Sequence, residues 1–161
     1  MIPMRRSERQ VTDLVAIQAI VAACRGCRLA VWDREGPYIV PMSFGALWEG
    51  ENLTLCFHCA GRGRKLSALR ENPLAAFEMD RLLRLTGQGG PPCAYSCDYQ
   101  SATGRGRVEF PEDPRDKSAA LEAILAHQTG RRIAVTEEMA RDVTVFLLRA
   151  DQYSAKARMS P

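Results

Sequence analysis

Apolar residues recur along this chain in two patterns, one typical of amphipathic helices and the other of half-buried strands. After Asp13, which can cap a helix, apolar side chains return at helical spacing as far as Cys24. A second helical pattern follows Asp113 and Pro114, a capping residue with proline at the first position, and ends at Gly130. The sequence therefore predicts two helices with defined ends, and shorter helical turns are expected at 66–70 and after Thr136.

Six other segments have the composition of strands. Residues 28–32 and 38–44 flank a turn that ends at Gly36, which predicts a hairpin. Pro41 cannot donate to a neighbouring strand, so it indicates a sheet edge or a bulge. Gly104 and Gly106 are expected bend or bulge points in a long strand. The other strands are expected at about 52–57, 74–79, 99–110 and 143–148, and residues 80–98 are expected to form a long irregular loop.

Short antiparallel strands of even spacing predict a mainly β fold with flanking helices, built around a small barrel. At 161 residues, with 46% hydrophobic and 25% charged residues, the chain is expected to form one domain over 1–161. The net charge of +3 is scattered, which argues against a nucleic-acid-binding face. We find no signal-peptide pattern and no apolar run of membrane-spanning length, so we expect a cytoplasmic protein without a membrane or nucleic-acid partner.

Six cysteines in such a chain are expected to be reduced thiols. The alternative is a four-thiolate zinc site from Cys24, Cys27, Cys93 and Cys97, to which the His58-Cys59 pair could contribute. Cys24 falls on the apolar face of the first helix, and no zinc-knuckle pattern of glycine and aromatic residues surrounds either pair. We therefore predict no metal, and the role of these four cysteines stays open.

The segment from His58 to Lys65 carries the clearest chemistry. It leaves an apolar strand, passes through Gly61 and Gly63, and holds three cations before a short helix. Glycines allow a close backbone approach, and the free amides at a helix start favour an anion. Arg64 offers a planar fork for phosphate oxygens and Lys65 a point charge. These features predict a phosphate-binding corner; the alternative is a solvated basic turn, since no P-loop or Rossmann fingerprint is present.

Several motifs together resemble one known family. They are Cys-Arg-Leu-Ala at 27–30, Pro-Tyr-Ile-Val-Pro-Met-Ser-Phe at 37–44, Leu-Cys-Phe-His-Cys-Ala at 55–60, Gly-Arg-Lys at 63–65, Asn-Pro at 72–73, Phe-Glu-Met-Asp at 77–80 and Tyr-Gln-Ser-Ala-Thr-Gly-Arg-Gly-Arg-Val-Glu-Phe at 99–110. In combination, over roughly residues 4–155, they resemble the FMN-binding split-barrel proteins. The nearest branch is the one related to pyridoxamine 5′-phosphate oxidase and the 5-nitroimidazole resistance proteins.

The resemblance implies a six-stranded antiparallel Greek-key split barrel and a homodimer with FMN at the subunit interface. It also implies that Arg64 and Lys65 hold the FMN phosphate, and that His58 lies on the substrate side of the flavin as a candidate catalytic residue. A proline-broken strand leaves polar backbone groups that could meet a flavin ring, and Tyr99 with Ser101 resembles the segment that reaches the partner's FMN. The full expected cofactor site is Pro41, Met42, Ser43, Phe44, His58, Cys59, Ala60, Gly63, Arg64, Lys65, Tyr99 and Ser101.

We therefore expect an FMN-binding oxidoreductase, a reductase or oxidase, acting on a small molecule. A non-catalytic flavin- or haem-binding module for storage or sensing is the alternative, and the sequence identifies neither the substrate nor the electron donor. One departure from the family matters. Pyridoxamine 5′-phosphate oxidase itself carries a C-terminal segment with Arg and Trp that binds substrate, whereas this chain has no Trp after Trp48. We therefore do not expect vitamin B6 oxidation.

Overall fold

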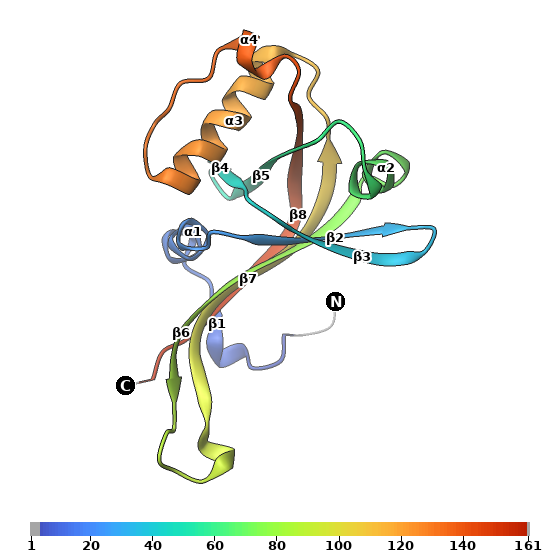
Figure 1. Cartoon of the computed structure of the whole chain (residues 1–161). Helices are drawn as coiled ribbons and strands as arrows, with labels where there is room; N and C mark the ends of the chain where they lie inside the picture. The colour runs from blue at the N-terminus through green and yellow to red at the C-terminus, as the bar shows by residue number, and fades with distance from the viewer. Residues whose placement is uncertain (1–3, 161) are drawn as a thin grey trace.

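The computed structural model describes residues 4–160, and they form a strongly coiled antiparallel sheet with helices packed around it (Figure 1). The mainly β architecture with flanking helices is thus confirmed, although the sheet has eight strands instead of six. Seven strands follow the order β3-β2-β6-β7-β8-β5-β4, and β1 pairs with β8. The elements are η1 (Ser7–Arg9), β1 (Gln10–Val11), α1 (Leu14–Ala23), β2 (Cys27–Asp33), β3 (Gly36–Met42), β4 (Gly45–Glu49), β5 (Asn52–Cys59), α2 (Arg64–Glu71), β6 (Leu74–Thr86), η2 (Pro92–Ala94), β7 (Ser96–Glu109), α3 (Pro114–Thr129), α4 (Glu137–Ala140) and β8 (Thr144–Arg158).

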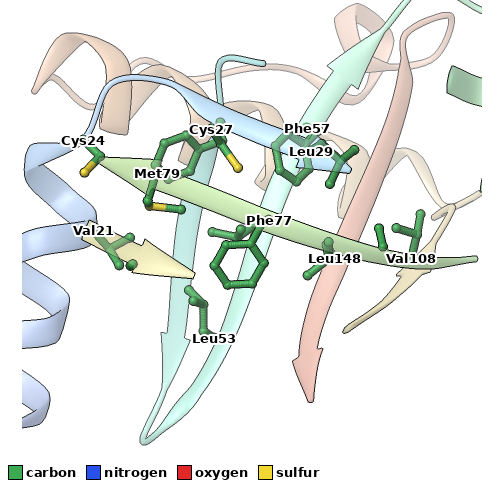
Figure 2. Close-up of a cluster of buried hydrophobic side chains, with 14 of the residues drawn as sticks. Val21, Cys24, Cys27, Leu29, Leu53, Phe57, Phe77, Met79, Val108 and Leu148 are labelled. Carbon is green, nitrogen blue, oxygen red and sulfur yellow. The ribbon is translucent and has the colours of Figure 1, made fainter. Parts of the chain in front are cut away.

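The inner face of the sheet encloses the main hydrophobic core. Figure 2 shows Val21 and Cys24, at the end of α1, beside Met79 of β6, so that α1 contributes to this core. Phe57 is fully buried and stacks on Phe146 with the ring centroids 5.0 Å apart. A second, smaller cluster forms where α3 packs on the other face of β5, through Cys56, Ala120, Ile124 and Val145. The strands are thus covered by helices only in part.

The helix ends follow the local signals in the sequence. The Asp13 carboxylate accepts a hydrogen bond from the Ala16 amide at 2.8 Å and caps α1. Asp113 caps α3, and Gly130 ends that helix in the left-handed conformation with φ +70°. Thr136 caps α4. Within the described residues, no helix is both long and apolar enough to cross a membrane.

The edge position expected for Pro41 is also observed. It lies in β3, the strand at one edge of the seven-strand order, which pairs with β2 on one side. A proline, which has no N–H to donate, is tolerated in such an edge strand. The predicted irregularity in the long strand is a register shift between Arg105 and Gly106, where β7 pairs with β8. Gly106 lies so close to β8 that a Cβ would sit 1.9 Å from the Arg149 carbonyl oxygen.

The prediction of a long loop over 80–98 is wrong. Strand β6 continues to Thr86 and pairs with β7 from Ser96, so the two form a long hairpin that projects from the barrel (Figure 1). A register shift between Leu82 and Arg84 explains the error, because the extra residue breaks the alternation of apolar and polar positions. Leu82 and Leu85 are 69% and 66% exposed, so burial imposes no pattern on this part of the strand.

Two other strand predictions needed correction. Strand β4 was not expected, although it pairs with β5 along its length. The last strand was expected to end at 148, but β8 runs to Arg158 and pairs with β7 over its second half. The segment after 148 is therefore part of the sheet, and its side chains have defined neighbours on β7.

Candidate functional site

The basic turn that the sequence singled out connects β5 to α2. Gly63 precedes the helix with φ +132°, a backbone conformation that side chains disfavour, and no side chain caps the helix start. The first amide groups of α2 therefore have no side-chain acceptor and point out of the helix end. Together with Arg62, Arg64 and Lys65, they form a corner that suits a doubly charged anion.

Lys65 carries its charge into this corner without a strong partner. Its ammonium Nζ lies 2.9 Å from the Met42 thioether sulfur and 6.0 Å from the centre of the Phe146 ring. A thioether is a weak acceptor. Among the described residues, no carboxylate or carbonyl oxygen accepts a hydrogen bond from this half-buried ammonium. The side chain is thus placed where an anionic ligand would supply its missing acceptor, and the corner fits a phosphate.

Arg64 is engaged by the turn between β2 and β3. Its Nε and Nη2 meet the two Asp33 carboxylate oxygens at 2.5 and 3.1 Å, and Nη2 lies 3.2 Å from a Glu35 oxygen. The guanidinium stacks over the Tyr38 ring, 4.5 Å from its centre. The hydrogen bond from Arg64 holds the pKa of Asp33 below its usual value, so this carboxylate is ionised at neutral pH. The sequence analysis missed both acidic residues, because only the fold brings them to Arg64.

The expected ring-contacting segment, 41–44, alternates between the two faces of the sheet edge. Met42 packs partly against the core and reaches Lys65, which joins two separately predicted parts of the site. Pro41 and Ser43 are exposed. Phe44 is fully buried, with its ring 4.3 Å from that of His127, and its carbonyl accepts a hydrogen bond from the Gln128 side chain. In this structure Phe44 anchors α3 to the start of β4, and its ring is not accessible to a ligand.

His58 and Cys59 end β5 on opposite faces. Cys59 packs partly against the main core, and burial raises the pKa of its thiol, an effect that Lys65 and Arg70 oppose. His58 is exposed and pairs in register with Val145 of β8. Strand alternation therefore puts His58 on the α3 side of the sheet, away from the face that carries Cys59. Ala60 follows in the exposed turn.

Tyr99 and Ser101 lie near the start of β7, away from the phosphate-binding corner at the start of α2 (Figure 1). No hydrogen bond or ion pair among the described residues joins them to 41–44 or 63–65. Their register partners on β8 are Arg158 for Tyr99 and Lys156 for Ser101. The sequence analysis did not single out these two cations, because it ended the last strand at 148.

A groove of about 1230 Å³ lies beside this part of β7 and β8. The N-terminal segment forms one wall, held by a hydrogen bond from Lys156 Nζ to the Arg5 carbonyl at 2.8 Å. Five charged residues line the groove: Arg5, Arg105 and Lys156 are cationic, and Glu51 and Asp151 are acidic. The groove is large enough for a cofactor-sized molecule or for a segment of another chain.

The cysteines are far from forming one site. Cys24 and Cys27 are buried where α1 meets β2, and burial raises their pKa values to about 11 and about 12. Cys93 is exposed in η2, at the tip of the projecting β6–β7 hairpin (Figure 1). Within residues 4–160, no group of three or more His, Cys, Asp or Glu side chains could hold a metal ion.

Comparisons with known proteins identify the family and the fold. The family model for pyridoxamine 5′-phosphate oxidase matches residues 14–157, which is most of the chain. No curated protein sequence matches this chain. The match includes the β2–β3 hairpin, the basic turn and most of the long β8 strand.

Several solved structures share the fold. A candidate 5-nitroimidazole antibiotic resistance protein from Bacteroides thetaiotaomicron has a TM-score of 0.77 and 32% identity, over 92% of this chain and 86% of its own. A flavocytochrome from Azotobacter vinelandii has a TM-score of 0.77 and 21% identity, over 99% of this chain and 73% of its own. An FAD- and haem-binding protein from Mycobacterium smegmatis has a TM-score of 0.76 and 20% identity, over 94% and 74%. The predicted fold class is confirmed by these similarities.

Proposed function

The chain belongs to the pyridoxamine 5′-phosphate oxidase family, and from this premise we propose that it binds FMN and acts as an oxidoreductase on a small molecule. The observation that carries the proposal is the half-buried Lys65 ammonium. It is held against a thioether at the uncapped start of α2, without an oxygen acceptor among the described residues. A flavin phosphate would supply that acceptor and satisfy the first amides of the helix.

Each part of the site has a role in this proposal. Arg64, Lys65 and the Gly63 turn hold the phosphate, and the exposed backbone near Met42 and Ser43 meets the polar edge of the flavin ring. Bound FMN supplies the redox chemistry. The residues of the chain bind and orient it, and Met42 with the partly buried Cys59 thiol forms an apolar lining near the phosphate corner. A thiol with a raised pKa stays protonated at neutral pH and adds no charge there.

His58 remains a candidate for the substrate side. Its side chain is exposed at the end of β5, so it is open to a small molecule approaching from solvent. The sequence similarity to a candidate 5-nitroimidazole resistance protein favours a nitroaromatic as the first substrate to test.

The site is proposed to be shared between two copies of the chain. In one chain Ser101 and Tyr99 lie away from the corner at α2, so a second copy would have to bring them to the flavin. Trp32, Ile39 and Leu74 are 61%, 63% and 52% exposed and occupy outer-face positions on three neighbouring strands. Apolar side chains grouped in this way are typical of a protein interface.

The test starts from the absorbance spectrum of freshly purified protein and a fluorescence titration with FMN. We expect saturable FMN binding that the double variant Arg64→Ala, Lys65→Ala abolishes without a loss of folding. Steady-state NAD(P)H oxidation with a nitroaromatic acceptor then separates an oxidoreductase from a storage or sensing module. Undiminished FMN affinity in the double variant would contradict the phosphate assignment, and an FMN-saturated monomer in sedimentation would contradict the shared site.

A further inference from the structure

The edge of the Arg64 guanidinium that would bind a phosphate already contacts acidic side chains of the β2–β3 turn. Its Nε and Nη2 edge makes a two-point contact with Asp33, at 2.5 and 3.1 Å, and Glu35 adds a second carboxylate at 3.2 Å. This is the geometry that an arginine uses to hold a phosphate group. A ligand phosphate and the β2–β3 turn therefore compete for the same donors.

Several contacts hold the β2–β3 turn beside α2. The Asp33 side chain, 15% exposed, also accepts a hydrogen bond from the Glu35 amide at 2.9 Å, and Gly36 closes the hairpin with φ +112°. At the other end of α2, Arg34 of the same turn makes an ion pair with Glu71 at 3.1 Å. The turn thus lies along α2 and is held at both ends of that helix.

We propose that Asp33 and Glu35 are internal carboxylate competitors that make this corner selective for a ligand with a doubly charged phosphate. This inference rests on the proposed flavin function, and it identifies what limits flavin affinity at that site. The turn carries three cations, at 62, 64 and 65, and the two carboxylates that contact Arg64 reduce the net charge of the corner to one. A dianion takes the hydrogen bonds of the guanidinium from the two carboxylates while the turn stays beside α2, whereas a neutral or singly charged ligand gains too little from the corner to do so.

The direction of the effect follows from charge. Once a phosphate is bound, each carboxylate lies a few ångströms from a like charge, and this repulsion opposes binding. If Asp33 only oriented the guanidinium, its removal would weaken binding. The inference therefore predicts tighter binding when the two negative charges are removed and the shape of the side chains is kept.

The experiment compares FMN with riboflavin, which is the same ring system without the phosphate. The double variant Asp33→Asn, Glu35→Gln keeps the size of both side chains and one acceptor oxygen in each, which at position 33 can still accept the hydrogen bond from the residue 35 amide. We expect it to bind FMN on the order of tenfold more tightly than the unmodified protein, from the removed repulsion. Its riboflavin affinity, measured by the same quenching of flavin fluorescence, should stay unchanged.

The matched control is Glu71→Gln, which removes the carboxylate that holds Arg34 of the same turn at the other end of α2. We expect the FMN affinity of this variant to match that of the unmodified protein. Because Asp33 closes the hairpin, the single variant Glu35→Gln serves as a second test, since that side chain is 79% exposed and folding should not depend on it. It should show a smaller gain in the same direction.

The outcomes separate the two proposals. Weaker or unchanged FMN binding in the Asp33→Asn, Glu35→Gln and Glu35→Gln variants would overturn the competitor role and leave the flavin function standing. An equal gain for riboflavin would overturn it too, because the effect would not involve the phosphate. If neither the unmodified protein nor the variants bind FMN, the flavin function itself is wrong and the competitor role is lost with it.

Discussion

Replacing Lys65 by Met should stabilise the fold and weaken flavin binding at the same time. The Lys65 ammonium lies half-buried against the Met42 sulfur and the Phe146 ring, both of which are weak partners for a cation. Methionine has nearly the same length and the same helix propensity, so α2 should keep its conformation. The change removes the charge and leaves the side chain in contact with the same apolar neighbours.

The two magnitudes follow from these contacts. A polar group buried without a compensating hydrogen bond costs about 1–3 kcal/mol, and the partial exposure of Lys65 puts the gain in unfolding free energy near the lower end, at about 1 kcal/mol. For a chain of this size that corresponds to a rise in melting temperature of roughly 2–4 °C. In the complex, loss of a charged hydrogen bond costs about 1.5–3 kcal/mol, which weakens FMN binding by roughly 10- to 150-fold.

Urea denaturation followed by circular dichroism measures the first effect, and an FMN fluorescence titration measures the second. Lys117→Met is the matched control, because Lys117 is also a partly buried helical lysine but donates to the Arg141 carbonyl at 3.0 Å. We expect this control to gain no stability and to bind FMN normally. A Lys65→Met protein that is less stable than the unmodified chain, or that binds FMN equally well, would refute the reasoning about this site.

Two further predictions concern the fold. Gly106→Ala should lower the melting temperature strongly, because its Cβ would lie 1.9 Å from the Arg149 carbonyl oxygen. Gly26→Ala is the control and should be tolerated, because no atom lies within 4 Å of its Cβ position. Equal melting temperatures for the two variants would contradict this prediction. Burial lowers the pKa of His127 in the folded protein, so below about pH 6.5 the unfolded chain binds more protons than the folded one. The free energy of unfolding should therefore decrease as the pH falls from about 6.5 to the lower pKa of the folded state. His127→Gln should remove that part of the pH dependence of the melting temperature, and an unchanged pH profile would show that another group is responsible.

The helix ends and the first hairpin could be read from the sequence because the interactions that set them are local. Asp13, Asp113 and Thr136 each cap a helix by bonding an amide two or three residues further on. The turn at 33–36 closes a hairpin whose strands are adjacent in the chain. The chemistry of the basic turn was equally visible, since three cations and Gly63 lie within four consecutive positions.

Interactions between distant segments could not be read in this way. The β6–β7 hairpin was mistaken for a loop because a register shift at Leu82 and solvent exposure remove the alternation that marks a strand. The end of β8 was missed for a similar reason. Its second half is held by pairing with β7, about 50 residues upstream, rather than by a pattern of its own.

The sequence by itself determined the helix ends and the cations of the corner, because these depend on residue type and near neighbours, and the family fold followed from the resemblance of its motifs to known proteins. Only the tertiary structure decided the partners of those cations. Arg64 meets Asp33, 31 residues away, and Lys65 meets Met42, 23 residues away. Charge can be counted along a chain, but whether a cation is paired or left for a ligand depends on which distant side chains the fold brings beside it.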